Sequence, residues 1–169
     1  MQVVWANAGH SMHEAIGEFV SFRLYGHPGA FRDYTAMGVF QDGTMIAGLV
    51  YYDYDRQAGV IQISGASDSA RWLTKPVLWE MFSFPFNEVG CQAVVMRVDP
   101  DDKRLGRMLP AYGFEKHVLP RMRGRDKDDA IFILFDDVWR ENQFHRENKS
   151  HVAPSDAVPN IGNGATMDA

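Results

Sequence analysis

Short runs of apolar residues, each ended by a turn signal, fill the region from residue 34 to residue 64. YTAMGVF and TMIAGLVYYDY flank QDG, whose Asp42-Gly43 pair is typical of a tight hairpin turn. A second turn, DRQAG, leads into the run VIQIS. The pattern therefore predicts three consecutive antiparallel strands.

A helix is predicted on either side of these strands. QVVW at 2–5 is a short strand candidate, and Ser11 with Glu14 then forms a capping-box pattern before apolar residues at helical spacing that end near Gly26. After the strands, GASDSARWLT is a turn and KPVLWEMFSF is a helix, with Thr74 as its cap. Pro85 is expected to end this second helix early.

The last third of the chain continues the alternation of strand and helix. CQAVVMRV is a buried strand, and DPDDKRLGRMLPAYGF is a short helix that ends at Gly113 and that Pro110 is expected to distort. FEKHVLPRM and DAIFILFDDVW are two further strands, joined by the charged turn RGRDKD. The cations from Arg121 to Lys127 are interrupted by Asp126, Asp128 and Asp129, which indicates a solvated hairpin. The order β-α-β-β-β-α-β-α-β-β predicts an α+β fold, with a mixed, mostly antiparallel sheet of about six to seven strands and helices on both faces.

Composition places a boundary near residue 140. All of the predicted elements lie in residues 1–140, whereas 141–169 hold few apolar residues and several Ser, Asn and Gly. Such a segment buries too little apolar surface to offset the entropy that it would lose on ordering. We expect one domain over 1–140 and a polar, flexible tail over 141–169 that is available to a protein partner.

Charge and cysteine content narrow the classes of function. The net charge of −5 argues against a nucleic-acid-binding protein. Cys91 is the lone cysteine, which fits a reducing compartment and an inert, packed thiol. No apolar run approaches the roughly 18 to 20 residues of a membrane span, and no signal peptide is visible. These features predict a cytoplasmic protein without membrane contact.

The six histidines give no convincing metal site. His10 and His13 lie three residues apart, but no third ligand has supportive spacing. His145 and His151 lie in the predicted tail. We therefore expect no metal.

Three loose motifs in a fixed order carry a resemblance to a known family. They are RWLTKPVLWEMFSFPFNEVGCQAVVMRVD, DDKRLGRMLPAYGFEKH and GRDKDDAIFILFDDVW. Together with the preceding meander of strands, they resemble the GCN5-related N-acetyltransferase (GNAT) family over residues 1–140. The likeness is greatest to the ribosomal-protein-acetylating branch and to short GNAT proteins of phage and bacterial genomes. A phage protein would act in the host cytoplasm or in the virion.

The resemblance implies acetyl-CoA as co-substrate and indicates where it binds. In the family, the turn after the fourth strand gives backbone N–H groups to the pyrophosphate, as a helix N-terminus does. The pantetheine arm lies between the splayed fourth and fifth strands. The positions that the order of motifs implies for these roles are Ile63, Gly65, Ser67, Ser69, Ala70, Arg71, Trp72, Thr74, Val95 and Arg97.

Catalytic residues are less well marked. Many members of the family have a tyrosine four residues before the glycine of GF, where this chain has Leu109, and the turn after Gly65 lacks the family's further glycines. Tyr112 remains as a candidate general acid. The preferred hypothesis is an N-acetyltransferase that moves acetyl directly from acetyl-CoA to a primary amine of a protein N-terminus, a lysine or a small molecule. The alternative is a non-catalytic GNAT-fold interaction protein or phage virion-associated protein.

Overall fold

The computed structural model describes residues 1–145. Of the predicted tail 141–169, residues 141–145 are described and are partly helical, and the rest lies outside the described residues. Seven strands form one sheet in the order β1-β2-β3-β4-β5-β7-β6. The elements are, in chain order, β1 (Gln2–Ala6), α1 (His13–Tyr25), β2 (Thr35–Gln41), β3 (Thr44–Asp55), β4 (Val60–Ser67), α2 (Lys75–Ser83), the π-helical η1 (Phe84–Val89), β5 (Ala93–Val98), α3 (Lys103–Tyr112), β6 (Glu115–Gly124), β7 (Lys127–Phe135), α4 (Asp136–Glu141) and the 3-10 turn η2 (Gln143–His145).

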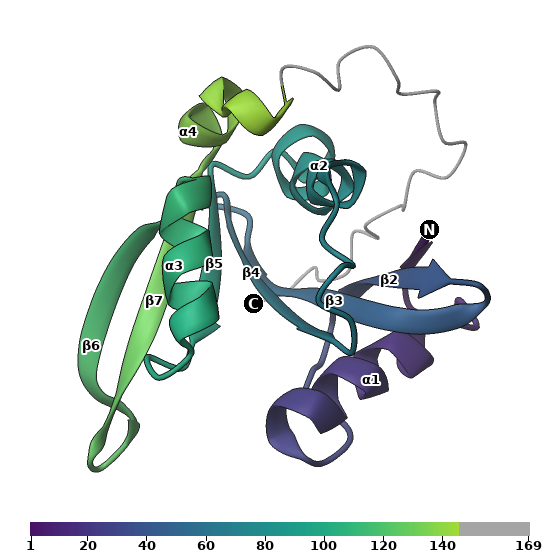
Figure 1. Cartoon of the computed structure of the whole chain (residues 1–169), viewed down its shortest axis with the longest axis horizontal. Helices are drawn as coiled ribbons and strands as arrows, with labels where there is room; N and C mark the ends of the chain where they lie inside the picture. The colour runs from purple at the N-terminus through teal and green to yellow at the C-terminus, as the bar shows by residue number, and fades with distance from the viewer. Residues whose placement is uncertain (146–169) are drawn as a thin grey trace, which may run out of the picture.

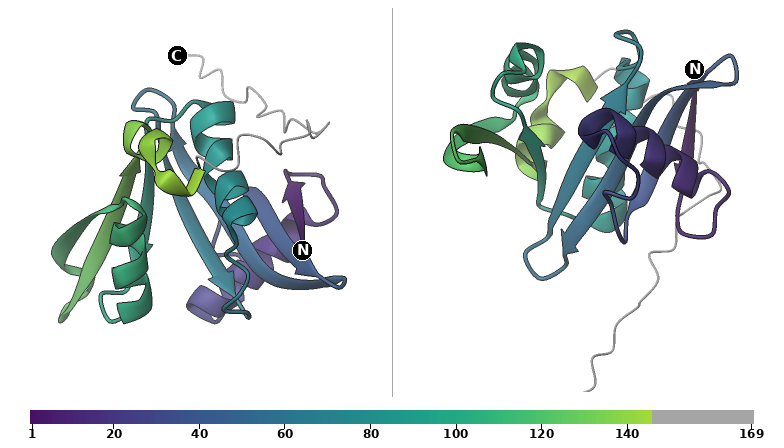
Figure 2. Two further views of the ribbon diagram at one scale, coloured as in Figure 1. Left: turned by 45° about the horizontal axis from the view of Figure 1, so that its top comes forward. Right: turned by 90° about the horizontal axis from the view of Figure 1, so that it is seen from below.

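The sheet is mixed, and helices cover both of its faces. Neighbouring strands are antiparallel except for β4 and β5, which run parallel. α1 packs against β2, β3 and β4 on one face, whereas α2 and α3 lie on the opposite face (Figure 1). Figure 2 shows the same two layers of helices from other sides. The predicted α+β fold is therefore confirmed. Among the described helices, none combines the length and the apolarity that crossing a bilayer requires.

Turn residues fix the meander of β2, β3 and β4 as the pattern predicted. Asp42 and Gly43 have φ angles of 51° and 77°, the left-handed conformations that a two-residue hairpin turn needs. Alternate residues of the strands then point to one face and are buried against α2 and α3. Met37, Leu49 and Phe132 are among the fully buried members of this main core.

The starts of the first two helices differ in how they are capped. Thr74 caps α2 as expected, since its Oγ1 accepts the Val77 N–H at 3.4 Å. The capping box predicted at Ser11 is wrong: α1 begins at His13 without a side-chain cap. The Met12 N–H instead donates to Nδ1 of His10 at 3.0 Å. The side-chain acceptor just before this helix is therefore His10 and not Ser11.

Prolines act differently in α2 and α3. α2 ends at Ser83, and the chain continues around Pro85 as the π-helical η1, so the expected early end is confirmed. α3 runs through Pro110 to Tyr112, so the expected distortion does not end this helix. Gly113 then closes it, with its N–H donating to the carbonyl oxygen of Leu109 at 3.2 Å.

The strand predicted through Trp139 is too long, because β7 ends at Phe135 and α4 follows. Asp136 and Asp137 occupy the first turn of α4, where carboxylates are favoured by the helix dipole. Trp139 is buried and fixes α4 to the domain. Asp136 and Asp137 were interpreted as the end of a strand, but they form the start of a helix.

Candidate functional site

The two parallel strands of the sheet separate soon after they begin. Backbone pairing joins Val60 to Ala93, Ile61 to Val94 and Gln62 to Val95. β4 continues to residue 67 and β5 to residue 98 without further pairing, so the sheet is open between them. The two strands diverge toward their C-terminal ends in Figure 1. Backbone donors and acceptors on the two facing edges therefore lack partners across this gap.

An apolar cavity of about 270 Å³ lies on the α2 and α3 side of this gap. Its walls come from the turn before α2, from α2 itself, from β5, from α3 and from the segment after α4. They consist of Trp72, Leu73, Leu78, Met81, Phe82, Met96, Leu105, Met108, Leu109, Ala111, Tyr112, Phe114 and Phe144. Lining of this kind suits an uncharged, flexible chain.

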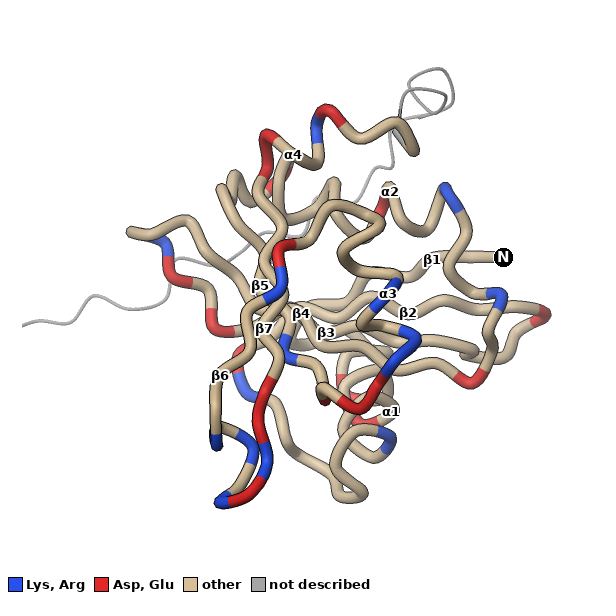
Figure 3. Tube along the Cα trace, turned by 60° about the vertical axis from the view of Figure 1, so that its left-hand side comes forward, with Lys and Arg blue, Asp and Glu red and all other residues tan. Residues whose placement is uncertain are grey.

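Cationic side chains border the cavity. Arg71, Arg104 and Arg107 are exposed, and each is next in sequence to a residue of the cavity wall. Arg104 Nη2 also donates to the Ala70 carbonyl oxygen at 3.5 Å, which places the first turn of α3 beside the turn before α2. Figure 3 shows the basic residues along α3 in blue. In a chain with net charge −5, this rim is a local concentration of positive charge.

Several backbone N–H groups in the turn before α2 already donate hydrogen bonds within the protein. The N–H groups of Asp68, Arg71 and Thr74 donate to acceptors within the protein. Pro76 has no N–H, and the Val77 N–H is taken by Thr74. An anion held here therefore depends on cationic side chains as much as on backbone amides.

The strand residues among the predicted binding positions divide between the two faces of the sheet. Ile63 is buried in the main core, on the cavity side. Val95 and Arg97 alternate with Met96, which lines the cavity, so they point to the α1 side. Gly65 and Ser67 lie in the part of β4 that has left β5.

The turn residues among those positions lie together at the mouth of the cavity. Trp72 lines it, and Arg71 next to it is exposed. Ser69 Oγ accepts the Arg71 N–H at 3.2 Å, whereas Thr74 serves as the helix cap and Ala70 binds Arg104 through its carbonyl. The serine and the threonine therefore shape the turn through these contacts.

A salt bridge holds this turn to the helix on the other face of the sheet. Asp68 accepts from Arg23 of α1 at 2.5 and 2.7 Å. The hydrogen bond from Arg23 holds the pKa of the Asp68 carboxyl below its usual range. The negative charge of Asp68 is thus directed toward α1 and is neutralised there.

Tyr112 lies at the C-terminal end of α3, in the wall of the cavity. Its ring stacks on Phe82 with 5.2 Å between centroids. Burial raises the pKa of the Tyr112 hydroxyl, an effect that a hydrogen bond with Trp139 opposes. The hydroxyl is therefore protonated at neutral pH, and it is a weaker acid than the hydroxyl of an exposed tyrosine.

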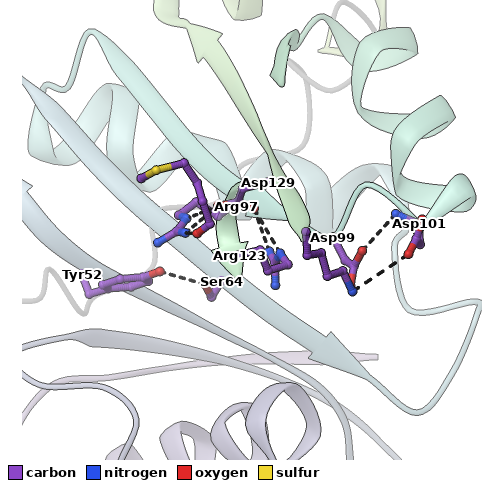
Figure 4. A network of polar contacts seen from close by, with 9 residues as sticks. Tyr52, Ser64, Arg97, Asp99, Asp101, Arg123 and Asp129 are labelled. Atoms are coloured by element: carbon purple, nitrogen blue, oxygen red, sulfur yellow. Dashed lines mark hydrogen bonds and ion pairs between the residues drawn. The ribbon is translucent and has the colours of Figure 1, made fainter. Parts of the chain in front are cut away.

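A polar network occupies the α1 side of the gap (Figure 4). The Tyr52 and Ser64 hydroxyl oxygens lie 3.0 Å apart. Asp129 of β7 is fully buried, and its two carboxylate oxygens accept from Arg97 Nε at 2.6 Å and from Arg123 Nη2 at 2.9 Å. A buried carboxylate requires such partners, so the two arginines are held in fixed positions beside the gap.

Several of these residues carried no sequence signal that we recognised. Arg104 and Arg107 lie three apart on α3, a spacing that places two cations on neighbouring turns of a helix and that could have marked them in advance. Asp129 and Arg123 lie in a charged hairpin that we interpreted as solvated. The pairing of Asp129 with Arg97 spans 32 residues and requires the sheet order, which the sequence does not state.

Comparison with solved structures identifies the fold. The spermidine/spermine N-acetyltransferase SpeG from Vibrio cholerae, in a mutant form, aligns over 82% of this chain and 98% of its own, with a TM-score of 0.64 and 8% identity. A protein described as a probable acetyltransferase aligns with a TM-score of 0.53 and 12% identity, over 63% of this chain and 63% of its own. No family model and no curated protein matches the sequence. The chain therefore has the fold of the GNAT acetyltransferases.

Proposed function

We propose that this protein is an acetyl-CoA-dependent N-acetyltransferase that moves acetyl directly to a primary amine. The observation that carries the proposal is the separation of β4 and β5 after Gln62 and Val95, beside an apolar cavity with a cationic rim. The structural neighbours named above are acetyltransferases by name, which supports the same activity.

The pantetheine arm of acetyl-CoA fits the gap for a physical reason. Its two amides need hydrogen-bond partners, and the separated edges of β4 and β5 offer unpaired backbone groups, as the edge of a sheet does for an added strand. Ile63 and Gly65 lie on one edge, and Val95 and Arg97 on the other. The alkyl parts of the arm would lie against the apolar wall formed by α2 and α3.

The phosphates of acetyl-CoA would be bound at the rim. Arg71 and Arg104 come from the two elements that meet at the mouth of the cavity, and Arg107 follows one turn later on α3. Arginine binds phosphate through charge-assisted, often bidentate, hydrogen bonds. The arginines would thus supply hydrogen bonds to phosphate in place of the backbone N–H groups that already donate within the protein.

The reaction needs little covalent help from the protein. The ammonium of the acceptor first gives one proton to water, and its nitrogen then attacks the thioester carbonyl, so that a C–N bond forms. The C–S bond breaks as the tetrahedral intermediate collapses. The departing sulfur and the second amine proton combine to give the thiol of coenzyme A. Tyr112 lies in the cavity wall, and its hydroxyl would relay this proton by taking one from the amine as it gives one to the sulfur.

Isothermal calorimetry with acetyl-CoA tests the proposal. We expect micromolar binding to the wild-type protein and binding weaker by about tenfold or more for Arg71→Glu, because a charge-assisted contact to phosphate becomes a repulsion. Arg56→Glu is the matched control, since Arg56 is exposed in the turn between β3 and β4, at the opposite end of β4. No binding to the folded wild-type protein would overturn the proposal and favour the non-catalytic alternative.

A further inference from the structure

The side of the gap that faces α1 carries polar groups from both strands. Extending the parallel register by two residues from Gln62 and Val95 sets Ser64 opposite Arg97 across the gap. Both side chains point to the α1 face, because they alternate with residues of the main core. Figure 4 shows Arg97 above the pair formed by Tyr52 and Ser64. The gap is therefore apolar on one side and polar on the other.

Arg97 is anchored but is still accessible. Asp129 fixes its guanidinium through two contacts, and Arg97 Nη2 also reaches the Met122 carbonyl oxygen at 3.3 Å. The Arg97 side chain remains 47% exposed. α1 packs mainly against β2, β3 and β4, so this arginine of β5 lies beyond the strands that α1 chiefly covers.

Two guanidiniums meet at one buried carboxylate beside the gap. Asp129 is shared by Arg97 and Arg123, so two cations meet one anion. Other carboxylates lie nearby: Lys127 binds Asp99 at 2.6 Å and Asp101 at 4.0 Å, and Asp53 accepts from the Gln62 amide at 3.0 Å. The cation that the strand register sets at the gap is thus Arg97, and a guanidinium attracts anions and repels ammonium groups.

We propose that the acceptor is a primary amine that also carries a carboxylate or phosphate group, and that Arg97 binds this anion. The inference rests on the proposed function, which places the cofactor on the cavity side and leaves the α1 side for the amine. Arg97 would fix the anion, so that the neighbouring amine nitrogen lies over the thioester carbonyl in the gap. A polyamine would meet the guanidiniums of Arg97 and Arg123 and is disfavoured as acceptor.

Matched pairs of amines test the inference through release of the coenzyme A thiol. Lysine is compared with cadaverine, and phosphoethanolamine with ethanolamine, so that each pair differs only by the carboxylate or the phosphate, and spermidine represents the polyamines. We expect the anionic member of at least one pair to have a kcat/KM higher by about tenfold or more, as a charge-assisted bidentate contact provides. The two pairs distinguish carboxylate from phosphate as the preferred anion.

Variants locate the effect at Arg97. Arg97→Lys keeps the charge but loses the planar fork, so it should raise KM for the anionic acceptor and leave the affinity for acetyl-CoA unchanged. Arg125→Gln removes one charge from an exposed position of the β6–β7 hairpin and should leave the preference intact. The wild-type comparison does not depend on how either variant folds.

A second readout covers the case in which no member of the panel reacts. Titration of the coenzyme A complex with lysine and with phosphoethanolamine should shift the Nε–H resonance of Arg97 in the NMR spectrum. Preference for cadaverine, ethanolamine or spermidine overturns the inference, and so does a silent panel with no shift at Arg97. Failure of acetyl-CoA to bind is a separate result that overturns the proposed function itself.

Discussion

The two sides of the gap between β4 and β5 differ in chemistry although the same strands form both. On the α2 and α3 side, Met96 belongs to an apolar wall with cations only at its rim. On the α1 side, the next residue, Arg97, joins Arg123 in an ionic network around the buried Asp129. Successive strand residues point to opposite faces, so a single separation of strands creates two unlike half-sites. An uncharged thioester arm and a charged acceptor can therefore meet at one point without sharing walls.

The largest expected effect comes from the ionic half-site. Replacing Arg97 and Arg123 together by Met leaves the fully buried Asp129 without a cation. Loss of the partners of a buried charge costs about 3–5 kcal/mol. We expect the free energy of unfolding, measured with urea, to fall by that amount. Each single substitution should cost less, because the other arginine still binds the carboxylate.

Asp129→Asn in the same background is the control for this double variant. Because the cost arises from an unpaired buried charge, removing the charge should restore most of the lost stability. A double variant that unfolds at the same urea concentration as the wild type would show that Asp129 is stabilised by something other than these arginines.

Local chemistry explains the parts of the fold that the sequence predicted correctly. Asp42-Gly43 supplies left-handed conformations at the hairpin, Thr74 caps α2, and Gly113 ends α3. Each of these is decided by residues a few positions apart. The start of α4 was missed for a related reason, because β7 and α4 are continuous and Asp136 was interpreted as part of a strand.

The candidate site was less predictable, since it depends on contacts between distant segments. The order of motifs placed Trp72 and Arg71 at the turn now seen beside the cavity. The point at which β4 leaves β5 has no local marker, and Asp129 becomes a partner of Arg97 only when β7 pairs with β5. Charge pattern alone therefore assigned Asp129 to a solvated hairpin, whereas the sheet order buries it.

A smaller effect is expected from filling the apolar half-site. Met108 is half-buried in the cavity wall on α3, and Met108→Trp would place an indole in the open volume. The cavity offers room for it, so stability should hold while the affinity for acetyl-CoA falls by about tenfold, through exclusion of the arm. Calorimetry with acetyl-CoA measures the loss.

Leu24→Trp is the matched control, because Leu24 is 44% exposed on α1, on the other side of the sheet. It adds the same ring and should leave acetyl-CoA binding unchanged. Wild-type affinity in Met108→Trp would instead exclude the cavity as the place where the arm binds.

The smallest expected effect concerns the salt bridge that joins the two sides of the sheet. Asp68 borders the cavity mouth and is bound by Arg23 of α1, whose hydrogen bond holds the pKa of the carboxyl below its usual range. A carboxyl with a lowered pKa in the folded state stabilises the protein above its unfolded pKa of about 3.9, and this contribution is lost as the pH falls through the lower folded value.

The Tm of the wild type should therefore slightly exceed that of Asp68→Asn at pH 7, and the difference should vanish in strong acid. Asp33→Asn, at another exposed position, should show no such trend. A Tm difference for Asp68→Asn that is the same at every pH would mean that the carboxylate charge does not hold this turn to α1.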